Sequence, residues 1–192
     1  MRRVFIVHGW NMSPEEPMLK WLREELQKKG IEVIAPSMPN PEVPKIETWV
    51  PLLAGLVGTL DQDTYFVGHS VGVQTILRVL AEAHDGTKIG GIISIAGWFS
   101  DLILDDEEDR EIAEPWLQTP IDFEKVQAMT HNIVAIFSDN DEFVPLQETR
   151  EQFEKNLGAQ IIEEHAQGHF TAGSGVTKLP SALAALEEMM GV

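Results

Sequence analysis

Six short runs rich in Val, Ile and Phe recur along the chain, and they constrain its fold more than any other feature. They are Val4–Val7, Ile31–Ala35, Thr64–Val67, Gly91–Ala96, Asn132–Phe137 and Gln160–Glu163. Most of these runs are continuously apolar and do not alternate between apolar and polar residues. Continuous apolar runs are typical of strands that are buried on both faces of a sheet. The runs therefore predict six strands in the interior of an α/β protein.

Longer segments with helical spacing separate these runs. In Pro17–Lys29, the residues Leu19, Leu22 and Leu26 share one face, and Gly30 follows as a typical residue after a helix end. Further helices are expected at Lys45–Leu60 (kinked at Pro51), Val71–His84, Leu146–Leu157 and Leu179–Met190. Because parallel strands need crossover helices, this alternation predicts a mostly parallel, doubly wound sheet.

The segment Trp98–Thr130 interrupts the alternation, and we interpret it as an irregular insertion. Its acidic part, Asp101–Glu114, is expected to be helical in part. The insertion is too short for a large lid domain. We therefore expect a shallow and partly open substrate pocket.

Five loops follow the predicted strands, and in sheets of this type ligands bind at the carboxyl ends of the strands. The loops are His8–Trp10, Gly68–Gly72, Gly97–Phe99, Ser138–Val144 and His165–Thr171. The second of them reads Gly68-His-Ser-Val-Gly72 and lies between an apolar run and a helical pattern. A sharp strand-to-helix turn of this kind exposes a nucleophilic serine, here Ser70, because the flanking glycines have no Cβ atoms to collide.

A serine hydroxyl needs a base to take its proton, and the base needs a carboxylate to orient it. The candidate acids lie in the loop Ser138–Val144, and of the histidines only His165 and His169 follow this loop. We favour His169, because it lies in a looser turn that can reach back over Ser70. Spacing alone leaves the acid open between Asp139 and Asp141.

Four motifs together resemble those of the α/β-hydrolase superfamily. They are His8-Gly9, Gly68-His-Ser-Val-Gly72, Ser138-x-x-Asp141-x-x-Val144-Pro145 and Gly168-His169-Phe170. The short length and the absence of a large lid narrow the resemblance to the small retinoblastoma-binding-protein-like and YdeN-like serine hydrolases. The resemblance implies a single α/β-hydrolase domain over residues 1–192, with three layers and a six-stranded, mostly parallel sheet. Ser138 departs from the pattern, because many members of the superfamily carry glycine there.

The resemblance also assigns roles to residues. It implies that Ser70 is the nucleophile, His169 the base and Asp141 the acid, since the acid of the family lies four residues before a proline. Its oxyanion donors correspond to the backbone N–H groups of Trp10 and Val71. Beyond the resemblance, Trp98 and Phe99 follow a strand end and are predicted to line the substrate pocket together with Trp10.

Composition excludes several classes of partner. The formal net charge of −17 argues against binding to nucleic acid or to an anionic membrane surface. The chain has no cysteine, no Gly-rich phosphate loop and no histidine pair with helical metal spacing, so neither a cofactor nor a metal ion is expected. The apolar run Val4–Val7 is too short for a secretory signal, and a cytoplasmic location is expected.

We therefore expect a cofactor-free serine hydrolase that cleaves small carboxylic esters through an acyl-enzyme. Amides, thioesters or another acyl acceptor are alternatives with the same intermediate. A different alternative is a protein-interaction module on the same fold with weak or vestigial activity, since fold alone does not determine function. Competent residues at all three triad positions favour the enzyme.

Overall fold

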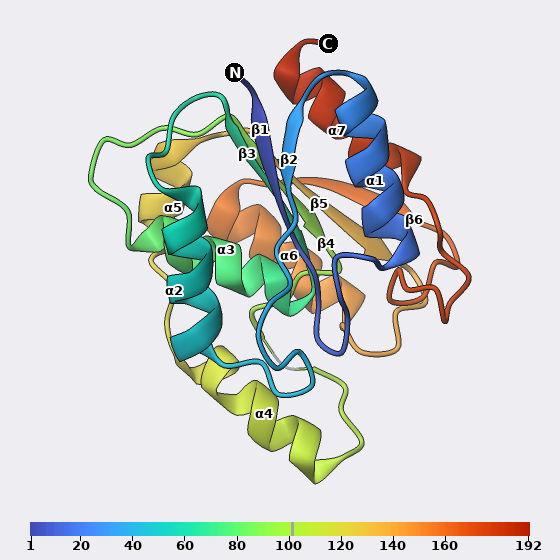
Figure 1. The fold of residues 1–192 in the computed structure, drawn as a ribbon. Coiled ribbons are helices and arrows are strands. Elements are labelled where there is room, and N and C mark those ends of the chain that lie inside the picture. Colours follow the sequence, from blue (N-terminus) through green and yellow to red (C-terminus); the bar gives the residue numbers. More distant parts are fainter. Residues whose placement is uncertain (101) are drawn as a thin grey trace.

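The computed structural model of the protein, which describes residues 1–100 and 102–192, contains a six-stranded parallel sheet (Figure 1). The strand order is β2-β1-β3-β4-β5-β6, and each neighbouring pair is parallel. The strands are β1 (Arg3–Val7), β2 (Glu32–Ile34), β3 (Thr64–His69), β4 (Gly91–Ile95), β5 (Ile133–Ser138) and β6 (Gln160–Glu164). All six predicted strands are confirmed, with ends that shift by one or two residues.

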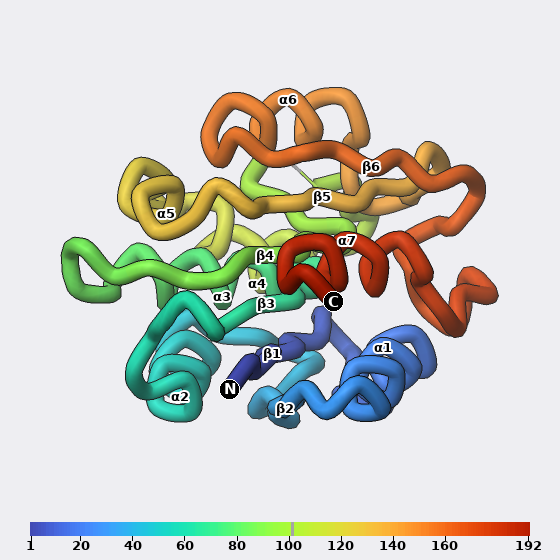
Figure 2. The backbone as a smooth tube through the Cα atoms, turned by 90° about the horizontal axis from the view of Figure 1, so that it is seen from above, coloured from blue at the N-terminus to red at the C-terminus, as the bar shows by residue number. Residues whose placement is uncertain are grey.

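Helices cover both faces of the sheet, which gives the three layers of the predicted fold (Figure 2). One face carries α1 (Pro17–Lys28) and α7 (Pro180–Met190). The other face carries α2 (Ile46–Val57), α3 (Val71–Ala81), α5 (Phe123–Met129) and α6 (Leu146–Leu157). Pro51 lies inside α2, as the sequence predicts.

Two hydrophobic cores form because successive side chains of a strand point to opposite faces. In β1, Val4 and Ile6 pack with α1 and α7, whereas Phe5 and Val7 pack with the helices of the other face. All four side chains are at most 1% exposed. This burial on both faces explains why the central strands are continuously apolar in the sequence. The edge strands β2 and β6 are only partly buried and carry charged residues such as Glu32 and Glu163.

The order in which strands are added to the sheet reverses at β1, because β2 pairs on one side of this strand and β3 on the other. In an open α/β sheet, such a switch leaves a crevice at the carboxyl ends of the two strands. These ends lie at the lower edge of the sheet in Figure 1. The loops after β1 and β3 therefore meet where a ligand is expected.

The segment Trp98–Thr130 is more regular than predicted. It contains α4 (Glu107–Gln118) and α5, and α5 is the crossover helix that leads into β5. The side chain of Asp106 caps α4 by accepting a hydrogen bond from the N–H of Glu108. Three acidic residues in the first turn stabilise the helix further, because they lie at the positive end of its dipole. Within the predicted stretch Asp101–Glu114, Asp101 itself lies outside the described residues.

Within the described residues, the additions to the doubly wound pattern are therefore α4 and the segment between β4 and α4. The helix lies beyond the carboxyl ends of the strands, below the sheet in Figure 1. A single helix of 12 residues agrees with the expectation that this protein has no large lid. Among the helices of the described residues, none combines the length and apolar character that crossing a membrane requires.

Candidate active site

Ser70 occupies the turn between β3 and α3. Its backbone angles are φ 52° and ψ −123°, a conformation that residues other than glycine rarely adopt. Such strain costs on the order of 1–3 kcal/mol and persists only where the surroundings enforce it. Here the N–H of Ser70 donates to the carbonyl of Ile95 at 2.9 Å, which continues the pairing of β3 with β4. The turn is thus held by the sheet itself.

The glycines on either side of Ser70 are required by close backbone contacts. A Cβ atom on Gly68 would lie 2.7 Å from the backbone nitrogen of Val73, and one on Gly72 would lie 2.4 Å from the carbonyl oxygen of Val7. Both distances are too short for real Cβ contacts. The first turn of α3 therefore packs directly on the end of β1, and this contact brings Ser70 close to the loop that follows β1.

His169 and Asp141 form a largely buried pair at the same edge of the sheet. The Nδ1 of His169 lies 2.8 Å from Oδ2 of Asp141, and their side chains are 12% and 3% exposed. Since the carboxylate accepts, Nδ1 carries the proton and leaves Nε2 free to act as a base. The second carboxylate oxygen accepts from the N–H groups of Phe143 and Val144, at 2.9 and 3.2 Å. Asp141 is thereby oriented toward His169.

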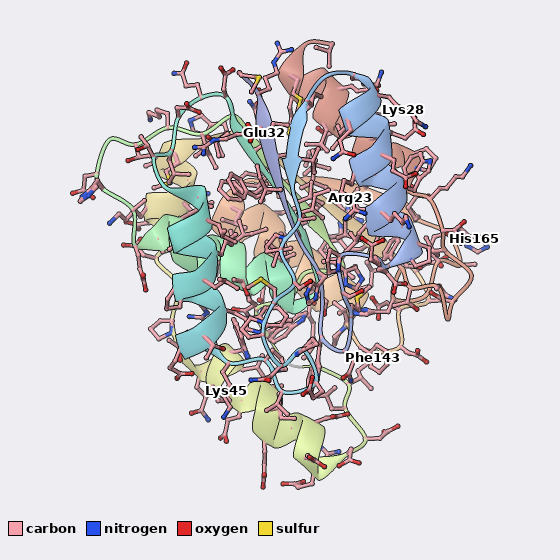
Figure 3. All side chains as sticks on the ribbon, in the orientation of Figure 1. Arg23, Lys28, Glu32, Lys45, Phe143 and His165 are labelled. Carbon is pink, nitrogen blue, oxygen red and sulfur yellow. The ribbon has the colours of Figure 1, made fainter. Side chains whose placement is uncertain are left out.

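The two residues that the sequence left as alternatives pair with each other. His165 Nδ1 lies 2.5 Å from Asp139 Oδ2, and the His165 side chain is 90% exposed. It extends from the edge of the molecule into solvent in Figure 3, whereas Phe143 lies at the lower end of the sheet. Hydrogen bonds from the N–H of Ala166 and from His165 lower the pKa of Asp139. Each candidate acid is thus paired with a different candidate base.

A cavity of about 240 Å³ connects Ser70 with His169, and His165 does not line it. Ser70 is 7% exposed, and its Oγ accepts a hydrogen bond from Nε1 of Trp98 at 3.2 Å. The residues that line the cavity are Trp10, Asn11, Met12, Ser70, Trp98, Leu102, Leu104, Asp109, Phe143, His169 and Thr171. Trp10 and Trp98 therefore lie where the sequence predicts a pocket wall.

The expectation for Phe99 needs correction. Its ring does not line this cavity but stacks on Phe153 of α6, with ring centroids 4.1 Å apart, and meets the edge of Phe123 at 4.9 Å. Trp98 contacts Ser70 through its indole N–H, whereas the ring of Phe99 packs between α5 and α6.

His8 fixes the loop that follows β1. Its Nε2 accepts from the N–H of Met38 at 2.9 Å, so its proton is on Nδ1, which lies 2.8 Å from the carbonyl of Gly9. Burial lowers the pKa of His8, which keeps the ring neutral in this arrangement. Trp10, at the end of this loop, is held by a hydrogen bond from its Nε1 to the carbonyl of Glu42 at 2.9 Å.

The acid loop also holds the loop that carries His169, and sequence reasoning missed this function. Ser138 Oγ accepts from the N–H of Gln167 at 2.9 Å, and Asn140 Oδ1 accepts from the N–H of Gly168 at 2.8 Å. Ser138 Oγ in turn donates to Asn140 Oδ1 at 2.8 Å. The serine that departs from the superfamily pattern therefore binds a backbone group that glycine could not bind.

Sequence reasoning also missed several cavity residues, chiefly Leu102, Leu104, Asp109 and Phe143. The sequence signal for the two leucines was the short apolar run Leu102-Ile-Leu104 directly before the acidic run. Among residues 1–100 and 102–192, no cluster of three or more His, Cys, Asp or Glu side chains is placed to hold a metal ion.

The chain is similar to known serine hydrolases in sequence and in fold. The family described as "Serine hydrolase" matches residues 4–188. The hydrolase YdeN of Bacillus subtilis is 31% identical over 93% of this chain and 91% of its own, and the crystal structure of the B. subtilis ydeN gene product superposes with a TM-score of 0.91 over 100% of both chains. Serine hydrolase RBBP9 of Rattus norvegicus is 29% identical over 85% of this chain and 78% of its own. The structure of Est1E from Butyrivibrio proteoclasticus with ferulic acid bound has a TM-score of 0.73 at 18% identity, covering 99% and 88% of the two chains, and shows the shared fold.

Proposed function

Because this chain belongs to the serine hydrolase family, we propose that it hydrolyses small carboxylic esters through an acyl-enzyme on Ser70. One observation carries the proposal. The strained Ser70 opens into the same cavity as His169, whose Nδ1 lies 2.8 Å from Asp141. These are the nucleophile, base and orienting acid of a triad, which is recognised by geometry and roles.

In the proposed reaction, Ser70 Oγ attacks the carbonyl carbon of the ester while Nε2 of His169 takes the hydroxyl proton. Asp141 holds the proton on Nδ1 and stabilises the imidazolium that forms. The protonated His169 then donates its Nε2 proton to the leaving alcohol, and the acyl group stays on Ser70. Water activated by the same nitrogen releases the carboxylic acid and restores the serine.

The negative charge on the carbonyl oxygen needs hydrogen-bond donors. We assign this role to the backbone N–H groups of Val71 and Trp10. Val71 is the first residue of α3, so its N–H has no partner within the helix and lies at the positive end of the helix dipole. The contact of Gly72 with the end of β1 supports the second donor, because it brings the loop of Trp10 to the same place.

The cavity indicates a small substrate. Its volume of about 240 Å³ lies below the range of roughly 300–1,000 Å³ that is typical of sites for drug-sized ligands. Indole, phenyl and leucine side chains form much of its wall, which suits a short acyl or aromatic group. Est1E shows that a relative in fold binds a small aromatic carboxylic acid, which is compatible with this substrate class.

A fluorophosphonate probe tests the proposal directly. The wild-type protein should be labelled at one site and should hydrolyse p-nitrophenyl butyrate, and Ser70→Ala should lose both properties with an unchanged circular dichroism spectrum. Persistent labelling of Ser70→Ala would remove Ser70 from its role. A wild-type protein that neither reacts with the probe nor cleaves esters would refute the proposal.

A further inference from the structure

His69, the residue before Ser70, has a contact that the proposed triad does not use. Its side chain is fully buried, and its Nε2 lies 2.8 Å from the backbone carbonyl of His169. A carbonyl can only accept, so Nε2 carries the proton and donates. The rings of His69 and His169 meet edge to face with centroids 4.9 Å apart. The residue next to the nucleophile thus binds the backbone of the base, although 100 positions separate the two histidines.

The slot around His69 is shaped for this side chain. Among the described residues, its Nδ1 has no hydrogen-bond partner and faces the Cα of Gly9. A Cβ atom on Gly9 would lie 2.5 Å from that nitrogen. The ring is therefore enclosed between the loop after β1 and the loop of His169. It has no room to shift toward Gly9, and water does not reach its Nε2 to replace the carbonyl of His169 as acceptor.

The segment that carries His169 needs such an anchor. It belongs to the stretch between β6 and α7, and Ala166, Gly168 and Phe170 all have positive φ values of 54–55°. Two of these three residues are not glycine, so the loop is strained and requires contacts that enforce its conformation. Asp141 fixes only the imidazole ring of His169, whereas the position of its backbone depends on other groups.

We propose that His69 is a positioning residue that holds the backbone of His169 in register with Ser70, so that Nε2 of His169 can reach the serine hydroxyl. This inference rests on the proposed function. Because His69 and Ser70 are adjacent, the hydrogen bond ties base and nucleophile through a single backbone link. Burial, together with the nearby His169, lowers the pKa of His69 to about 3. The ring therefore stays neutral and does not compete for the proton that His169 carries.

Two substitutions separate the hydrogen bond from the packing. His69→Phe keeps a ring of similar size but removes the donor, whereas His69→Gln keeps an N–H that can reach the carbonyl. The matched control is Asn132→Leu, which removes another side-chain donor to a backbone carbonyl, that of Gly90 at 2.9 Å, near the opposite ends of the strands. Steady-state hydrolysis of p-nitrophenyl butyrate, fluorophosphonate labelling rates and thermal melting are measured for all variants.

We expect His69→Phe to lower kcat about 10- to 100-fold with KM nearly unchanged, since misplacement of a catalytic group by about 1 Å has effects of this size. Labelling should slow in parallel, His69→Gln should recover most of the rate, and Asn132→Leu should retain wild-type kcat. Wild-type kcat in a folded His69→Phe, or equal losses in the Phe and Gln variants, would overturn the inference. Should His69→Phe not fold, His69→Met, which also lacks a donor and packs flexibly, takes its place. A wild-type protein without labelling or activity would instead refute the proposed function.

Discussion

Trp98 donates a hydrogen bond from its indole Nε1 to Ser70 Oγ, with a distance of 3.2 Å between the two atoms. Trp98 is 2% exposed and lies in the loop after β4, so its ring is fixed by packing. The bond occupies one acceptor position of the Ser70 hydroxyl oxygen, and the hydroxyl proton is the one that passes to His169 in the proposed mechanism. A residue of the cavity wall thus binds the side chain of the proposed nucleophile directly.

Substitution of Trp98 tests this contact. We expect Trp98→Phe to lower kcat about fivefold, because the net value of one hydrogen bond is about 1 kcal/mol. KM for a short ester should change less than kcat. Fluorophosphonate labelling and steady-state kinetics measure both effects. An unchanged kcat would show that the indole N–H has no part in orienting Ser70.

The two acid–base pairs predict losses of very different size for the two aspartates. Asp141→Asn should reduce kcat by about 10⁴-fold, as expected when the imidazole is held in the wrong tautomer. Asp139→Asn should reduce it far less, because the partner of Asp139 is the exposed His165. Steady-state kinetics of both folded variants decide the assignment. Equal losses would mean that the acid role is shared or wrongly placed.

The size of the cavity predicts the acyl-chain preference. A volume of about 240 Å³ gives room for a short chain but not for a fatty acyl chain. Acetate to butyrate p-nitrophenyl esters should therefore be cleaved with higher kcat/KM than the palmitate ester. A chain-length series with Ser70→Ala as the blank provides the measurement. A maximum at long chains would contradict the assignment of this small cavity as the acyl site.

Asp109 predicts discrimination against anionic substrates, because this acidic residue is part of the lining of the cavity of Ser70. Asp109→Asn should raise kcat/KM about tenfold for the p-nitrophenyl monoester of a dicarboxylic acid, and little for a neutral ester of equal length. Glu111→Gln is the matched control, since Glu111 lies on the same helix but lines a different surface hollow. Equal effects of both variants would indicate the long-range field of the −17 net charge and not a local contact.

Burial of His69 predicts a pH dependence of stability. The unfolded chain binds a proton at His69 near its ordinary pKa of 6.5, whereas the folded protein does so only near 3. The unfolded state therefore binds more protons in this window, and the unfolding free energy falls as pH decreases through it. At pH 5 the loss should be about 2 kcal/mol relative to pH 7. His8 and His169 are the titratable neighbours of His69, and both remain in the comparison variant.

Urea unfolding of wild type and His69→Gln at both pH values isolates this contribution. The variant should lose about 2 kcal/mol less than wild type between pH 7 and pH 5. The same pH dependence in both proteins would mean that His69 is protonated in the folded state, or that another group dominates.

Local patterns in the sequence were sufficient to predict the six strands and the helices outside the segment Trp98–Thr130. A strand buried on both faces must be apolar throughout, as in β3 and β4, and a strand-to-helix turn as tight as that of Ser70 tolerates only glycine at Gly68 and Gly72. These requirements act within a few residues, so they are visible in the chain. The insertion was predicted less well, because α4 buries only Ala113 and Trp116 and is solvated over most of its surface.

Only the tertiary structure decided how the side chains after the strands pair. Asp139 and Asp141 are two positions apart and chemically identical, so spacing could not tell which one meets His169 and which meets His165. Trp98 and Phe99 are likewise neighbours in the loop after β4, but Trp98 contacts Ser70 whereas Phe99 stacks on Phe153. The bond from His69 to the carbonyl of His169 spans 100 positions and carries no local signature. Such contacts depend on where parallel strands end relative to one another, and that register exists only in the folded sheet.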